Sequence, residues 1–161
     1  GKMGKRLIDE AFLYSADLQD LGFKERYIWL GLLLICDDFG WVKDDETFLK
    51  NRIAASLRIS KATFGASLRI FEERGMILRR CFQAGTIELS ALKLRNFSKW
   101  NRLPRARISE FELLEQKRKE KKRDEGEAEE PRLEEEMERA KRLKYDNGNL
   151  VKNLSRRMKI N

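Results

Sequence analysis

Large apolar side chains are concentrated in the first two thirds of the chain, and this distribution limits where a core can form. All aromatic residues except Tyr145 precede residue 112. The stretch 116–136 has a single leucine and no other large apolar side chain. Such a stretch buries too little surface to offset the entropy lost on ordering it. We therefore predict a globular domain over residues 5–107, followed by a charged, helical or partly disordered tail over residues 108–161.

Charge is also unevenly distributed along the chain. The 161 residues include 35 Lys and Arg and 27 Asp and Glu, which gives a net charge of +8. Residues 60–107 alone carry 11 basic and 3 acidic side chains, an excess as large as that of the whole protein. A localised positive charge favours a polyanionic partner, either nucleic acid or an anionic membrane surface.

Several classes of site are excluded by composition. The chain has no histidine, which removes Ser-His-Asp and Cys-His catalysis, two-histidine zinc sites and imidazole pH switches. Cys36 and Cys81 are too few for a zinc site or a disulfide framework, so we expect a reducing cytoplasm. The longest apolar run, 27–36, is shorter than the roughly 20 residues that span a bilayer. With no phosphate-binding glycine loop either, we expect a non-enzymatic protein without cofactor, metal or membrane contact.

Apolar periodicity and capping signals predict three helices, a short strand and a hairpin within the domain. The expected elements are a helix over 24–37 with a stop at Gly40, a strand at 41–42, a helix from Asp44 or Asp45 to about Leu57, a helix over 61–74 capped by Ser60 and stopped by Gly75, and strands over 76–82 and 86–89. This order predicts a mainly α fold with a small β-hairpin, a winged helix-turn-helix. The apolar run 27–36 is then core.

The helix over 61–74 is the candidate recognition element. Phe64, Leu68 and Phe71 recur at i, i+4 and i+7 and are expected to face inward. The outward positions would then be Lys61, Ala62, Gly65, Ala66 and Arg69. The small residues would let the helix enter a major groove, and the side chains expected to contact DNA are Ser60, Lys61, Thr63 and Arg69. The alternative is a surface helix for protein contacts, with Gly65 easing packing.

The hairpin and the segment after it carry further cations. Arg79 and Arg80 are adjacent on a strand and must point to opposite faces, and the tip 83–86 is uncharged. Residues 93–107 contain no acid, and their candidate DNA-binding side chains are Lys93, Arg95, Lys99, Trp100, Arg102, Arg105 and Arg107. Trp100 could stack on a base, and we expect Phe97 to pack on the domain. The alternative for both regions is solvated cations that contact no nucleic acid.

Two groups of neighbouring carboxylates, 37–38 and 44–46, could suggest a metal site. Each group is contiguous in sequence, and no histidine or further motif supports metal binding. Helix capping and turn formation explain these residues better. A weak apolar stripe in the tail, which includes Leu133 and Met137, could dock on the domain or on a partner helix.

Three stretches resemble the N-terminal winged-helix domain of phage replisome organisers and DnaD-like primosome proteins. They are 21–26 with the apolar helix and the turn 36–40 (CDDFG), the helix exit 68–77 (LRIFEERGMI), and the aromatic segment 96–101 (NFSKWN). Asn101 stands where the family more often has glutamine. The resemblance covers about residues 6–101 and implies a non-enzymatic module that binds DNA or self-associates at the start of replication. The charged tail departs from the family's helical C-terminal domain.

We therefore expect a DNA-binding replication initiation factor of phage or plasmid type. Duplex DNA is the favoured partner, and single-stranded DNA is the other form considered. The tail could bind a replication protein, and the chain could form a homo-oligomer. A winged-helix transcription regulator and a protein scaffold in a replication complex are the alternatives.

Overall fold

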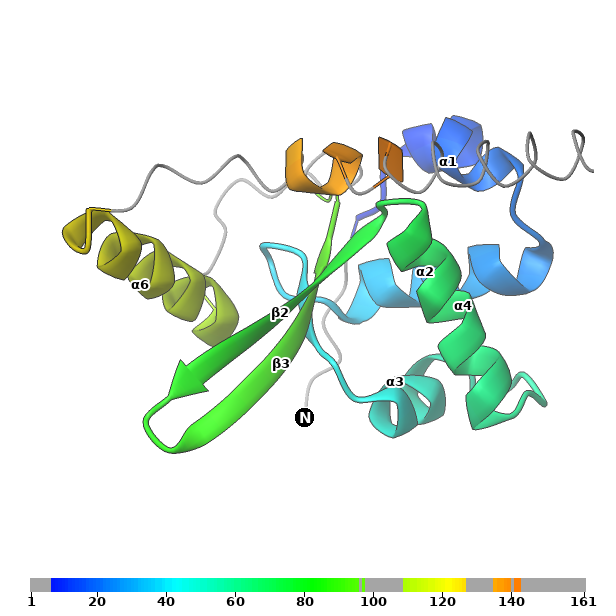
Figure 1. Ribbon diagram of the computed structural model, residues 1–161. Helices are drawn as coiled ribbons and strands as arrows, with labels where there is room; N and C mark the ends of the chain where they lie inside the picture. Colours follow the sequence, from blue (N-terminus) through cyan, green and yellow to red (C-terminus); the bar gives the residue numbers. More distant parts are fainter. Residues whose placement is uncertain (1–6, 96, 98–108, 127–134, 140, 143–161) are drawn as a thin grey trace, which may run out of the picture.

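A computed structural model describes residues 7–95, 97, 109–126, 135–139 and 141–142 (Figure 1). The elements in chain order are η1 (Glu10–Tyr14), α1 (Ala16–Gln19), α2 (Phe23–Ile35), β1 (Trp41–Lys43), α3 (Glu46–Ile53), α4 (Lys61–Glu73), β2 (Ile77–Ala84), β3 (Ile87–Leu94) and α6 (Glu110–Asp124). Residues 135–139 and 141–142 are also helical. The predicted fold class is confirmed in part, since the structure is mixed α/β with helices and a small antiparallel sheet. None of the described helices is long and apolar enough to cross a membrane.

The three predicted helices are present, and local capping explains where they begin and end. Asp45 accepts a hydrogen bond from the amide of Phe48 at 3.0 Å, which begins α3. Ser60 caps α4 as predicted, and Gly75 follows α4 with a positive φ of 69°. α3 ends at Ile53, earlier than the predicted end near residue 57.

The sheet contains β1 as well as the hairpin. Its strand order is β1-β3-β2, with both neighbours antiparallel to β3. The hairpin closes through Gly85 and Thr86, and Gly85 adopts a φ of 65° that favours glycine. The predicted strand 86–89 was too short, because β3 continues to Leu94. Ala91 and Leu92 are both buried, on opposite faces of the sheet, so the usual apolar–polar alternation is absent there.

The main core lies between the helices and one face of the sheet. Its fully buried helical side chains are Ile28, Trp29, Leu32 and Leu33 of α2, Leu49 of α3, and Phe64, Leu68 and Phe71 of α4. The three residues of α4 are those predicted to face inward. Trp29 and Phe71 meet edge to face with ring centroids 5.2 Å apart, an arrangement that aromatic pairs favour.

The prediction that all of 27–36 is core is wrong for one face of α2. Phe23, Tyr27 and Leu34 are 88%, 43% and 48% exposed. A helix turns only part of its circumference toward a core, and a continuous apolar run has no periodicity to show which part. Beside Tyr27 and Leu34, a Cβ at Gly31 would collide with Ile53, so glycine allows α2 and α3 to approach closely.

The opposite face of the sheet is covered by α6, which the sequence placed in the charged tail. Phe111 and Leu114 of α6 pack on a cluster formed by Trp41, Phe82 and Ala91. Glu112 accepts a hydrogen bond from the indole N–H of Trp41 at 2.8 Å. The packed part of the molecule therefore continues beyond residue 107, and the sheet lies between two layers of helix.

The helical residues 135–139 and 141–142 also dock on the domain. Met137 is 1% exposed, and its carbonyl oxygen lies where a Cβ on Gly75 would come within 2.7 Å. Lys141 forms an ion pair with Asp17 at 3.9 Å. In Figure 1 these residues, coloured orange, lie on the side of the molecule opposite the hairpin tip. Docking of the tail's apolar stripe on the domain is thus confirmed for Met137.

Candidate nucleic-acid interface

The first turn of α4 is held by its cap. The Ser60 hydroxyl oxygen accepts a hydrogen bond from the amide of Thr63 at 3.1 Å, and the two hydroxyl oxygens lie 2.9 Å apart. These two predicted contact residues are therefore brought together. Their hydroxyl groups also hydrogen-bond to each other. A phosphate bound there would therefore contact the hydrogen-bonding positions that these hydroxyl groups leave open and the exposed first turn of the helix.

The outer face of α4 presents two of the predicted DNA-contacting side chains. Lys61 and Arg69 are exposed, and neither forms an ion pair with any residue in the described part of the chain. Gly65, predicted to face outward, is buried instead. A Cβ at Gly65 would lie 2.9 Å from the carboxylate at the end of the Glu46 side chain of α3. The outward position predicted for Gly65 is therefore wrong, because this glycine lies against Glu46.

Three further cations on the α3–α4 unit were missed by the sequence analysis. They are Lys50 and Arg52 in the last turn of α3 and Arg58 in the connection to α4. Like Lys61 and Arg69, they have no ion-pair partner among the described residues. These cations lie close in sequence to the predicted recognition helix, and this could have indicated them. Helix α3 was predicted only to pack against the core. We call these five residues the α3–α4 cations.

Arg79 of the hairpin is occupied by two carboxylates. Its Nη1 donates to Asp44 at 2.7 Å, and its Nε donates to Glu72 at 2.8 Å. Ser90 also donates to Asp44, at 3.0 Å. Burial lowers the pKa of Arg79, but the hydrogen bonds and charges of Glu72 and Asp44 outweigh it, so the pKa is raised above its ordinary value. This guanidinium stays charged and joins α4 to the sheet.

Arg80 points to the other face of the sheet, as strand alternation predicts. Its Nε lies 3.5 Å from the buried carboxylate of Glu115 on α6, and its Nη2 lies 3.0 Å from Glu136. Arg118 completes the group by donating to both Glu115 oxygens, at 2.6 and 3.1 Å. Arg80 therefore connects β2 to α6 and to the docked residues 135–142.

The predicted basic segment 93–107 begins inside the folded domain. Lys93 lies on β3 and donates to the carbonyl oxygen of Phe39, with its ammonium 5.2 Å from the Trp41 ring. Arg95 forms an ion pair with Glu138. Phe97 is buried against Gly40, which confirms its predicted packing role. The other predicted contacts, Lys99, Trp100, Arg102, Arg105 and Arg107, lie outside the described residues.

Two of the neighbouring carboxylates, Asp37 and Asp45, have the turn and capping roles predicted for them. Asp45 caps α3, and Asp37 accepts from the amides of Phe39 and Trp41 at 2.8 and 3.0 Å. Asp44 binds Arg79 instead of capping a helix. Among the described residues, no group of three or more His, Cys, Asp or Glu side chains could hold a metal ion.

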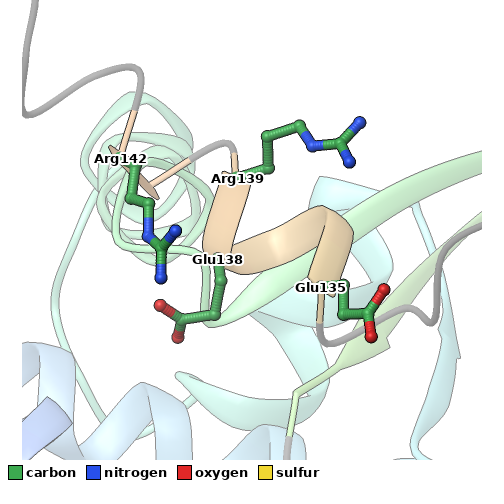
Figure 2. A pocket seen from close by; sticks show the side chains of 4 residues that line it. All are labelled: Glu135, Glu138, Arg139 and Arg142. Carbon is green, nitrogen blue, oxygen red and sulfur yellow. The ribbon is translucent and has the colours of Figure 1, made fainter.

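A hollow beside residues 135–142 has a volume of about 430 Å³ and is lined by Glu135, Glu138, Arg139 and Arg142. Figure 2 shows Arg139 directed away from Glu138. Glu138 forms the ion pair with Arg95. Among the lining residues that the structure describes, two acids and two arginines balance in charge.

Comparison with known proteins found no matching family model, no similar curated protein and no similar solved structure.

Proposed function

We propose that this chain is a non-enzymatic protein that binds duplex DNA through a winged helix-turn-helix. The order α2, β1, α3, α4, β2, β3 and the strand order β1-β3-β2 support this arrangement. α4 would be the recognition helix, and the β2–β3 hairpin would be the wing. In Figure 1 the hairpin tip and the beginning of α4 both lie toward the bottom of the view.

The availability of the α3–α4 cations is the observation that carries this proposal. The hairpin cations Arg79 and Arg80 are neutralised by carboxylates of the protein itself, whereas the α3–α4 cations have no ion-pair partner in the part of the chain that the structure describes. Unpaired cations gathered on one helix-turn-helix are suited to bind phosphates, because each phosphate neutralised releases a condensed counterion. Lys61 would act beside the capped start of α4, where backbone amides also favour an anion.

The biological setting we infer is the start of DNA replication in the cytoplasm of a phage- or plasmid-carrying cell. This rests on the resemblance of residues 6–101 to replisome organisers, and a winged-helix transcription regulator would use the same surface. A scaffold role is the second candidate, favoured by Phe23, Tyr27 and Leu34 on the exposed face of α2. Such a scaffold could self-associate or bind a replication protein.

The test is fluorescence anisotropy of labelled duplex and single-stranded DNA over a salt series. The double variant Lys61→Ala/Arg69→Ala should weaken duplex binding and reduce the slope of log K against log salt by up to about 1.8, near 0.9 per phosphate contact. Alanine preserves helix propensity at both sites. Lys24→Ala/Lys141→Ala removes the same charge from ion-paired lysines on other elements and should change the slope little.

The outcomes separate the candidates. Loss of duplex binding in the α4 variant alone would support groove entry, and an equal loss on both DNA forms would contradict it. Preferred binding to one palindromic duplex would favour a regulator. Wild-type protein that binds no DNA at low salt would overturn the proposed function and favour the scaffold.

A further inference from the structure

A groove of about 300 Å³ runs between strand β2 and helix α6. It lies on the flank of the hairpin away from α4, and the structure shows seven residues that line it. They are Cys81, Phe82 and Gln83 from β2 and Leu114, Lys117, Arg118 and Lys121 from α6. Phe82 is buried and Leu114 is half-buried, so an apolar floor holds the two elements together.

The rim of this groove is cationic. Of the seven described lining residues, three are basic and none is acidic. Lys117 and Lys121 are exposed, lie one helical turn apart on the same face of α6, and form no ion pair with any described residue. Arg118 is oriented by its two hydrogen bonds to Glu115. The cationic rim therefore projects from a helix that is fixed against the sheet.

The groove also adjoins the proposed wing. β2 is an edge strand, so its alternate backbone N–H and C=O groups point away from β3 toward the groove. Gln83 is two residues from Gly85 at the hairpin tip, a distance of about 7 Å along a strand. A polyanion held at the tip could therefore continue into the groove without a break.

We propose that the β2–α6 groove binds the phosphate backbone of nucleic acid that continues past the hairpin. Lys117 and Lys121 lie about 6 Å apart along the helix axis, and one DNA strand presents a phosphate about every 3.4 Å of its axis, so each lysine can reach a different phosphate of one strand. This inference rests on the proposed DNA-binding function and extends it, because it assigns a second, α6-borne phosphate site outside the helix-turn-helix.

Charge-matched variants of the full chain test the site. Lys117→Gln/Lys121→Gln removes the two rim lysines. Lys119→Gln/Arg123→Gln removes the same charge at the same spacing, from the opposite face of the same helix. The groove variant should reduce the salt slope of duplex binding by about 1.8 and the control by less than half of that. Equal changes in the two variants would overturn the proposal.

If wild-type protein binds duplex DNA but the groove variant and the control show the same salt slope, the groove proposal fails while the proposed function stands. Binding of polyglutamate but not of DNA that is lost in the groove variant would also overturn it, in favour of an acidic protein segment.

Discussion

Replacing Glu115 by glutamine should destabilise the protein, because this buried carboxylate lies between two arginines. The side chain of Glu115 is 2% exposed, while those of Arg80 and Arg118 are each 18% exposed. Glutamine has nearly the same volume, so the change removes charge without opening a cavity. Both guanidiniums would then be left partly desolvated without their shared counter-ion.

The size of the effect follows from what the two arginines retain. Removing one partner of a fully buried ion pair costs about 3–5 kcal/mol. Here Arg80 keeps its ion pair with Glu136 at 3.0 Å, and both arginines keep some contact with solvent. We therefore expect a loss of about 2–3 kcal/mol in the free energy of unfolding, below the range for full burial.

Urea unfolding followed by far-UV circular dichroism measures this loss. With an m value of about 1–3 kcal/mol/M, the midpoint should fall by roughly 0.7–3 M. The control Glu120→Gln makes the same chemical change at an exposed site on α6 and should stay within about 0.5 kcal/mol of wild type. If α6 detaches separately, its amides would exchange faster while the global midpoint holds. An unchanged midpoint together with unchanged α6 exchange would refute the reasoning.

Two further predictions concern local backbone geometry. Gly75→Ala should cost about 2–3 kcal/mol of unfolding free energy in urea, because it adds a clash with the carbonyl of Met137 to the strain of a positive φ. Gly126→Ala has a similar φ of 74° but open space around its Cβ, so it should cost about 1 kcal/mol, and equal costs would show that residues 135–142 do not dock at Gly75. Ser60→Ala should cost about 1 kcal/mol and Ser60→Gly only a few tenths, and a neutral alanine variant would contradict the capping role.

Helix positions could be predicted from sequence because their determinants are local. The caps at Asp45 and Ser60 and the stop at Gly75 each act within a few residues, and all three are confirmed. The full length of β3 was not predictable, since its pairing with β1 buries residues on both faces. The docking of α6 was hidden for a related reason. Its sequence is dominated by charge, and the contacts of Phe111 and Leu114 together with the ion pairs of Glu115 show how such a helix can be packed.

The candidate site was predicted in part. The exposure of a side chain could be predicted where it depends on local helix spacing, and not where it depends on partners far away in the sequence. Lys61 and Arg69 were found because the inward spacing of α4 fixes its outward face. Arg79 and Arg80 also looked available to DNA. Three of their carboxylate partners, Asp44, Glu115 and Glu136, lie 35 or more positions away along the chain. The net charge of a segment can be counted from its sequence. Which of its charges are neutralised by carboxylates far away along the chain cannot.

Because these arginines are paired within the protein, the positive charge available to a partner lies on other elements than the hairpin. Among the described residues, Arg79, Arg80 and Arg95 hold the layers together through carboxylates of α4, α6 and residues 135–139. Two groups of cations without an ion-pair partner among the described residues lie on either side of the hairpin, the α3–α4 cations and the rim lysines Lys117 and Lys121. Two cationic surfaces on either side of one hairpin can hold an extended polyanion at two places. For the proposed DNA-binding function, neutralising either surface alone should weaken binding, and neutralising both should reduce the salt slope by the sum of the two effects.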